Sequence, residues 1–174
     1  AAPLRQRHCA DMTQSAAVFT LSSADETAQI ARRIGHVLQP GDCVLLEGPI
    51  GAGKTHFARA LIQSRLHHPE DVPSPTFTLV QIYDLADAEL WHADLYRLTS
   101  LDEIEELGLS EALQEAICLI EWPDRLAEYT PAHALHLSLA LVPNSENQRQ
   151  LRLCWSDEKW RPIMQEISEE FADE

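Results

Sequence analysis

The stretch Gly48–Thr55 reads GPIGAGKT, which is a glycine, four residues, and then glycine, lysine and threonine. The run before it, 43–47, is short, apolar and prone to form a strand, whereas the run after it, 56–62, has apolar residues at helical spacing. A strand, a glycine-rich loop and a helix in this order are the context in which this pattern binds phosphate. The bland alternative is a glycine-rich turn that happens to precede a lysine. The flanking runs favour a phosphate-binding loop.

The residue types in this loop suit an anionic ligand. Glycines at 48, 51 and 53 can adopt a positive φ and let the backbone approach a phosphate closely. Successive backbone N–H groups then form an anion-binding nest, to which the start of the next helix adds unpaired donors and its positive dipole end. Lys54 supplies a mobile charge for the β- and γ-phosphates of a nucleotide, and the Thr55 hydroxyl is a candidate magnesium ligand.

Length and charge limit what the chain can be. Its 174 residues suit one domain. We expect that domain over 18–174, after a disordered or artificially added segment over 1–17 in which Met12 is the candidate natural start. The formal net charge of −15 argues against direct binding to tRNA or DNA phosphates, because such binding depends on Lys and Arg. It leaves open a nucleic-acid pathway in which a partner holds the nucleic acid.

The cysteines and the hydropathy pattern predict a cytoplasmic protein with no membrane role. None of the four cysteines shares a metal-ligand spacing with another, and Cys43 and Cys118 lie in apolar strand-like runs that favour buried free thiols. This usage suits a reducing compartment. No apolar run approaches the roughly 18 residues of a membrane span, and no apolar stretch follows the basic N-terminus as in a secretory signal.

The first half of the chain predicts strands and helices around the loop. An alternating run at 18–21 predicts a strand, and Ser23 with Glu26 predicts the capped start of a helix that ends at Pro40-Gly41. The helix after the loop should extend to about Leu66.

The segment 72–76 is stiff because Pro73 and Pro75 keep the residues before them out of the helical region. It presents the hydroxyls of Ser74 and Thr76. One interpretation is a rigid linker; the other is a switch-like loop that senses the γ-phosphate of a nucleotide, with Thr76 as the candidate sensor.

Two acidic residues are expected at the ends of strands. Alternation over 76–83 and 89–94 predicts an antiparallel hairpin that ends at Asp94, a candidate for holding magnesium directly or through water. The apolar run 116–120 is typical of a central parallel strand buried on both faces, and Glu121 follows it. Ligand clefts of open α/β sheets lie at this end of the strands, although a solvated strand-end residue is an equal alternative for Glu121 alone.

The rest of the chain adds short helices and a second hairpin. An acidic helix over 101–107, closed by Gly108, precedes a short helix over 111–115 that Ser110 is expected to cap. Strands over 134–142 and 150–155 should form the second hairpin, and a helix should start near Pro162. These elements predict an α/β, P-loop NTPase-like three-layer fold, with a mostly parallel central sheet and antiparallel hairpin additions.

Four blocks of the sequence, in this order, resemble the bacterial threonylcarbamoyladenosine biosynthesis ATPase family TsaE, also called YjeE. They are GAGKT at 51–55, SPTFTLV at 74–80, HADLYRL at 92–98 and IEWP at 120–123. The resemblance spans roughly 19–153. A phosphate loop alone marks thousands of proteins, whereas the other three blocks are much more specific. Pro49-Ile50 and Ala93 depart from the family, in which Asp-Leu and Phe are usual.

The resemblance implies ATP and Mg²⁺ as cofactors and assigns roles by position. Lys54 matches the phosphate lysine and Thr55 the magnesium-binding threonine, while Glu121 matches a magnesium-linked glutamate and Asp94 a strand-end aspartate. The remaining implied nucleotide contacts are Gly51, Ala52, Gly53, His56, Trp122, Ala24 within the adenine-side stretch 22–27, and Arg149 in the last hairpin. Gln148 stands before Arg149, where the family often has glycine.

The resemblance also implies partners. The family's ATPase acts with TsaB and TsaD, whose complex transfers a threonylcarbamoyl group to an adenosine beside the tRNA anticodon. The ATPase does not perform the transfer, and its ATP cycle resets the partner complex between turnovers. The acidic balance fits this role, because the tRNA would be held by the partners.

The leading hypothesis is a magnesium-dependent ATPase that acts on a protein partner. Lys54 and the loop amides would stabilise charge on the transferring phosphoryl group, and Thr55 would hold the metal with Asp94 or Glu121. Glu121 has a second candidate role, which is to orient the attacking water.

Three alternatives belong to other classes. A small-molecule or nucleotide kinase usually needs an arginine-bearing lid, and the segment 66–94 contains no arginine. A GTP switch needs an Asn-Lys-x-Asp signature, but neither Asn144 nor Asn147 precedes a lysine. A non-catalytic binding module would not need the intact set of Lys54, Thr55 and the two acids.

Overall fold

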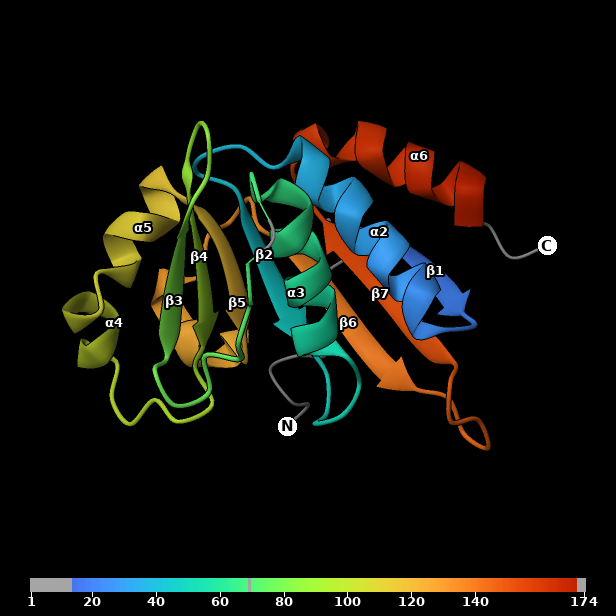
Figure 1. Ribbon diagram of the computed structural model, residues 1–174, viewed down its shortest axis with the longest axis horizontal. Coiled ribbons are helices and arrows are strands. Elements are labelled where there is room, and N and C mark those ends of the chain that lie inside the picture. Colours follow the sequence, from blue (N-terminus) through green and yellow to red (C-terminus); the bar gives the residue numbers. More distant parts are fainter. Residues whose placement is uncertain (1–13, 69, 172–174) are drawn as a thin grey trace.

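The computed structural model describes residues 14–68 and 70–171 (Figure 1). These residues form one seven-stranded sheet in the order β1-β7-β6-β2-β5-β4-β3. The strands are β1 (Ser15–Leu21), β2 (Cys43–Glu47), β3 (Val80–Asp84), β4 (Glu89–Asp94), β5 (Ile117–Glu121), β6 (Leu135–Leu141) and β7 (Arg149–Trp155). The helices are α2 (Ala24–Val37), α3 (Lys54–Arg65), α4 (Asp102–Glu106), α5 (Leu109–Glu115) and α6 (Arg161–Phe171), with 3-10 segments η1 (Pro123–Tyr129) and η2 (Glu158–Trp160).

The centre of the sheet is parallel. Strand β2 pairs in parallel with β5 and β6, and β4 pairs in parallel with β5. The outer pairs β3–β4, β6–β7 and β1–β7 are antiparallel. The predicted α/β fold, with a mostly parallel core and antiparallel hairpin additions, is therefore confirmed.

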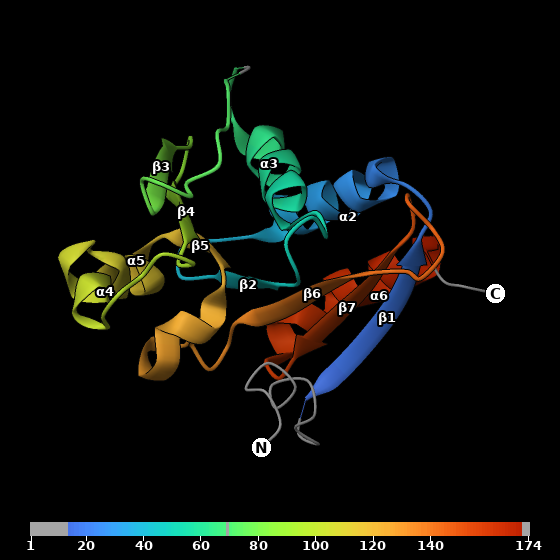
Figure 2. The ribbon, with the colours of Figure 1, turned by 90° about the horizontal axis from the view of Figure 1, so that it is seen from below.

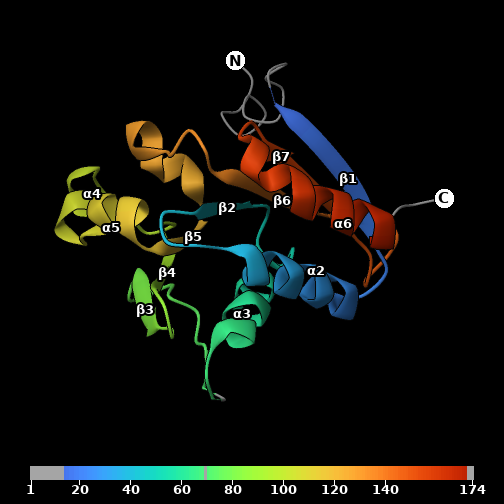
Figure 3. The same cartoon turned by 90° about the horizontal axis from the view of Figure 1, so that it is seen from above.

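Helices cover both faces of the sheet and complete the three layers (Figures 2 and 3). Neighbouring strand residues point to opposite faces, so Val44 and Leu46 lie in the core under α2, α3 and α6, while Cys43 and Leu45 lie in the core under α4 and α5. The β5 residues are all buried, as their apolar run predicts. Among the described residues, no helix is both long and apolar enough to span a bilayer.

The first strand starts earlier than expected. Residues 15–17 pair with 153–155 of β7, so they belong to the sheet and not to a disordered leader. Antiparallel pairing with β7 extends the edge strand through a Ser-Ala-Ala sequence that has little strand preference of its own. The predictions for 1–13, including Met12 as a natural start, lie outside the described residues.

Two local predictions were wrong. The strand expected over 76–83 begins only at Val80, because 76–79 form a turn closed by a 2.7 Å hydrogen bond from Leu79 N to Pro75 O, with φ of Leu79 at +67°. Ser110 does not cap α5, because that helix starts at Leu109 after Gly108, whose φ is +79°. The Ser110 hydroxyl instead donates to Glu105 Oε2 at 2.8 Å.

Candidate functional site

The glycine-rich loop lies between β2 and α3 and needs its glycines for distinct reasons. Gly48 has φ of +144°, and a Cβ on it would lie 2.4 Å from the carbonyl oxygen of Leu139 in β6. Gly51 and Gly53 have φ of +86° and +108°. Helix α3 starts directly after Gly53, and no side chain of the described residues caps it. The first-turn amides of α3 therefore face the loop, where an anion would be stabilised.

Lys54 is held against the loop and an aromatic ring. Its side chain is mostly buried, and Nζ donates to the carbonyl oxygen of Gly48 at 2.5 Å. The same Nζ lies 3.5 Å from the ring centroid of Trp122. Trp122 follows β5 in the left-handed region, with φ of +58°, and its ring packs at 5.0 Å against that of Tyr96. This backbone turn brings the indole over the lysine.

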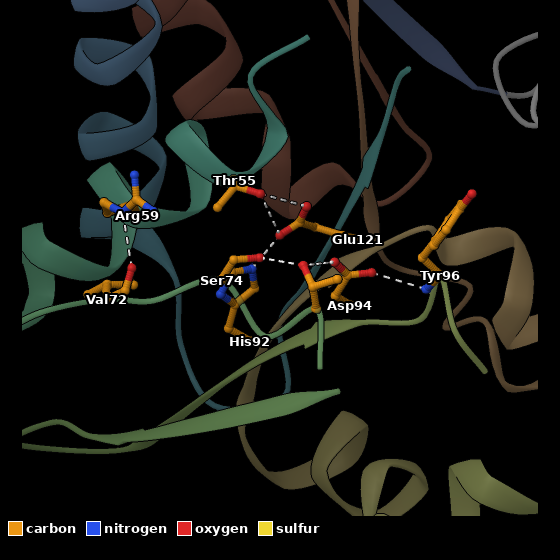
Figure 4. A network of polar contacts seen from close by, with 9 residues as sticks. Thr55, Arg59, Val72, Ser74, His92, Asp94, Tyr96 and Glu121 are labelled. Carbon is orange, nitrogen blue, oxygen red and sulfur yellow. Dashed lines mark hydrogen bonds and ion pairs between the residues drawn. The ribbon is translucent and has the colours of Figure 1, made fainter. Parts of the chain in front are cut away.

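The two predicted acids lie side by side at the carboxyl ends of β4 and β5. Asp94 and Glu121 are register partners, and both are buried. Thr55 Oγ1 donates to Oε1 of Glu121 at 3.1 Å, and His92 Nε2 lies 2.7 Å from Oε2 of Glu121 (Figure 4). The carboxylate of Glu121 is thus joined both to the phosphate loop and to the neighbouring strand.

The stiff segment over 72–76 reaches the same end of the sheet. Thr76 Oγ1 donates to Asp94 Oδ2 at 3.3 Å and lies 2.7 Å from Ser74 Oγ. The backbone N–H of Tyr96 donates to the other Asp94 oxygen at 3.0 Å, and Arg59 of α3 donates to the carbonyl of Val72 (Figure 4). The segment therefore links α3 to Asp94.

A cavity of about 410 Å³ joins these groups. Its lining contains nine of the predicted site residues, namely Gly51, Gly53, Lys54, Thr55, His56, Thr76, Asp94, Glu121 and Trp122. A cavity of this size falls within the range of small-molecule sites. Among these predicted residues, the fold brings together positions as far apart in the chain as Gly51 and Trp122.

Three predicted residues do not line the cavity. Ala52 is buried beneath the loop. Ala24 contributes its carbonyl oxygen to a contact of 2.9 Å with Nε2 of His56. Arg149 holds the loop backbone from the β6–β7 hairpin, donating from Nε to the Ala52 carbonyl at 3.2 Å. The binding roles assigned by position to all these residues stay predictions.

The cavity also includes residues that sequence reasoning did not assign. Ile50, Tyr96 and Arg97 line it, and the Arg97 guanidinium stacks 4.5 Å from the ring centroid of the exposed Phe77. His92 of β4 does not line the cavity, but it contacts Oε2 of Glu121. The sequence contains a usable signal for His92. It lies two residues before Asp94 in a predicted strand, and residues two apart in a strand share one face.

The donor set has the chemistry that magnesium prefers. Thr55, Asp94 and Glu121 offer a hydroxyl and two carboxylates, and Mg²⁺ binds hard oxygens, usually one or two carboxylates together with substrate phosphates. No group of three or more His, Cys, Asp or Glu within the described ranges could hold a metal by itself. The residues fit a magnesium ion that arrives with a phosphate ligand.

The three-layer fold and the glycine-rich loop define a P-loop NTPase-like protein. A family model described as "Threonylcarbamoyl adenosine biosynthesis protein TsaE" matches residues 21–151. The chain therefore belongs to the TsaE family.

Relatives and a solved structure agree with this assignment. Proteins named tRNA threonylcarbamoyladenosine biosynthesis protein TsaE are similar over most of the chain. The one from Rickettsia conorii is 38% identical over 137 residues, covering 79% of this chain and 75% of the relative. The one from Bacillus subtilis is 32% identical over 145 residues, covering 83% and 89%. The crystal structure of Bacillus subtilis YdiB superposes with a TM-score of 0.71 and 25% identity, covering 90% of this chain and 97% of that one.

Proposed function

We propose that this chain binds and hydrolyses ATP with magnesium and serves the threonylcarbamoyl modification of adenosine in tRNA. The observation that carries the proposal is the convergence of Lys54, Thr55 and two buried acids in one cavity at the phosphate loop. The names of the relatives supply the pathway, because they are tRNA threonylcarbamoyladenosine biosynthesis proteins.

The residues divide the work by position. The loop amides and Lys54 bind the phosphates and stabilise the charge that develops on the transferring phosphoryl group. Thr55 holds the metal with Glu121 or Asp94, and Thr76 senses the γ-phosphate through its link to Asp94. Bound magnesium would supply further positive charge at the β- and γ-phosphates. Glu121 either takes part in metal binding or orients the attacking water.

The proposal places the output of hydrolysis in a protein partner. We infer that the partner is a complex of TsaB and TsaD, which transfers the threonylcarbamoyl group, and that this chain meets tRNA only through it. The net charge of −15 supports the indirect role, since affinity for nucleic-acid phosphates comes from Lys and Arg. A cytoplasmic location follows from the same proposal, because the modified tRNA is there.

Nucleotide binding and hydrolysis by the purified chain test the core of this proposal. Lys54→Ala should lower ATP affinity and turnover by about 100-fold or more, because the phosphate charge loses its main cation. Lys159→Ala is the matched control, since Lys159 pairs with Asp42 just before β2, outside the cavity lining. Equal rates of ATP hydrolysis by the wild type and by Lys54→Ala would reject the proposed ATPase site at the loop.

Added partners test the second half of the proposal. Turnover should be low for the chain alone and clearly higher with TsaB and TsaD present. High turnover without partners, together with phosphate transfer to an added nucleoside or sugar, would instead identify a kinase.

A further inference from the structure

His92 is a buried histidine to which neither the loop motif nor the metal chemistry assigns a role. Its side chain is 0% exposed, and its Nε2 lies 2.7 Å from Oε2 of Glu121, which is 2% exposed (Figure 4). Thr55 donates to the other oxygen, Oε1, at 3.1 Å, with a longer contact of 3.5 Å to Oε2. Two side chains from different elements, β4 and the first turn of α3, therefore hold the two oxygens of one carboxylate.

The register of the sheet explains how His92 reaches Glu121. His92 and Asp94 are two residues apart in β4 and share one face of the strand. Asp94 lies beside Glu121 in the register, while His92 lies beside Leu119, one step back along the same face of β5. His92 thus approaches the carboxylate from within the sheet, and Thr55 approaches it from the loop.

The two ring nitrogens of His92 lie in different surroundings. Nδ1 of His92 is buried, and it has no hydrogen-bond partner among the described residues. A contact of 2.7 Å to an ionised carboxylate oxygen needs a hydrogen between the two atoms. With an ionised Glu121, Nε2 is the nitrogen that donates in this contact. His92 itself is fully buried and lies outside the cavity lining, so it approaches the carboxylate from the side away from the cavity.

We propose that His92 is a positioning residue for Glu121. The ring Nε2–H donates to Oε2, and this hydrogen bond keeps Oε1 turned towards Thr55, which lines the cavity. This inference deepens the proposed function and rests on it. Without His92, the glutamate side chain would gain rotational freedom, and Oε2 would keep only the long contact of 3.5 Å from Thr55. Residues that orient metal-linked groups in this way matter nearly as much as the ligands.

The test compares nucleotide binding with and without magnesium. Affinity for the non-hydrolysable analogue AMP-PNP is measured by calorimetry in Mg²⁺ and in EDTA. His92→Leu should lose about 10- to 100-fold of the magnesium-dependent affinity, with a similar fall in kcat, whereas His92→Gln should stay within about threefold of wild type. The glutamine amide retains an N–H donor of similar reach. Affinity in EDTA should be the same for all three proteins.

Another buried histidine provides the control. His136 of β6 is 5% exposed and lies outside the cavity lining, so His136→Leu reports the general effect of losing a buried imidazole. It should keep the magnesium-dependent affinity of wild type. Should His92→Leu not fold, His92→Asn replaces it, because the shorter amide cannot reach Glu121.

The outcomes separate this inference from the proposed function. A wild-type chain that binds no nucleotide would reject the proposed function before any variant is measured. A wild-type chain that binds, with His92→Leu showing the same magnesium dependence and kcat, would overturn only the role of His92. An equal loss in His92→Gln and His92→Leu would overturn it too, since the donated hydrogen bond would then be irrelevant.

Discussion

Individual residues of the phosphate loop are constrained in different ways. Gly48 combines a positive φ with a backbone neighbour, because a Cβ would lie 2.4 Å from the Leu139 carbonyl oxygen. Gly51 also has a positive φ, of +86°, but a Cβ there would meet nothing within 4 Å. Gly48 is therefore required by its backbone conformation and by the close approach of β6, whereas Gly51 is required by its backbone conformation alone.

This difference predicts the order of two alanine substitutions. Gly51→Ala should lower the free energy of unfolding by about 1–2 kcal/mol, the cost of a left-handed backbone for a residue with a Cβ. Gly48→Ala should cost more than about 2 kcal/mol, because the clash with the Leu139 carbonyl adds to that strain. Urea denaturation of both variants checks the order. An equal fall in the free energy of unfolding would mean that β6 can move away from the loop without further destabilising the protein.

At the scale of elements, the start of α2 is joined to α3, the helix that begins with Lys54. The Ser23 side chain accepts from the Glu26 N–H at 3.3 Å, and the Glu26 carboxylate accepts from the Ser22 N–H at 2.9 Å. One turn into α3, His56 reaches the carbonyl of Ala24. The cap of α2 therefore fixes the segment 22–27, which is predicted to lie near the adenine.

Removing that cap should destabilise the protein measurably. Ser23→Ala takes away the acceptor for the Glu26 N–H and should lower the free energy of unfolding by about 1 kcal/mol. Ser22→Ala is the matched control, because Ser22 joins the cap through its backbone N–H, which alanine keeps. Chemical denaturation of the pair checks the expectation, and a similar cost for both would contradict a side-chain cap.

At the scale of the whole molecule, two apolar cores meet at the central strands. Cys43 and Cys118 are register partners on β2 and β5, both free and both in the core under α4 and α5. Burial raises the pKa of the Cys118 thiol from its ordinary 9.0 to about 12, and burial likewise raises the pKa of Cys43. The folded chain thus favours the neutral thiols.

This gives stability a dependence on alkaline pH. Because the folded pKa of Cys118 lies above the unfolded one, its contribution is fully present below pH 9 and is lost as the pH rises from 9.0 towards about 12. The urea midpoint of the wild type should therefore fall more steeply above pH 9 than that of Cys118→Ala. Parallel curves for the two proteins would show that the thiol does not titrate with unfolding.

Local patterns were sufficient for much of the fold and of the site. The apolar run 116–120 predicted a buried central strand, and the position of Asp94 and Glu121 after their strands predicted that they would meet. In both cases the signal lies within a few residues and needs only the general geometry of a parallel sheet.

Contacts made across the chain could not be read in the same way. The turn at 76–79 overrides a strand-like Thr-Phe-Thr-Leu sequence, and Leu79 is held there by accepting a hydrogen bond from the Asp94 N–H at 2.9 Å. The His92–Glu121 pair depends on the register between two strands. The position of Arg149 behind the loop depends on how the last hairpin lies, which no local pattern encodes.

That arginine has a consequence for how a ligand would be received. Arg149 donates to the carbonyls of Ala52, Glu146 and Gln148, with a longer contact to Gly51. It ties the loop to the tip of the β6–β7 hairpin while the opposite side of the loop stays turned to the cavity. The loop is therefore preorganised by folding, because the entropy of ordering its backbone is lost before any anion arrives. The β6–β7 hairpin thus holds the loop in place, although it does not line the cavity.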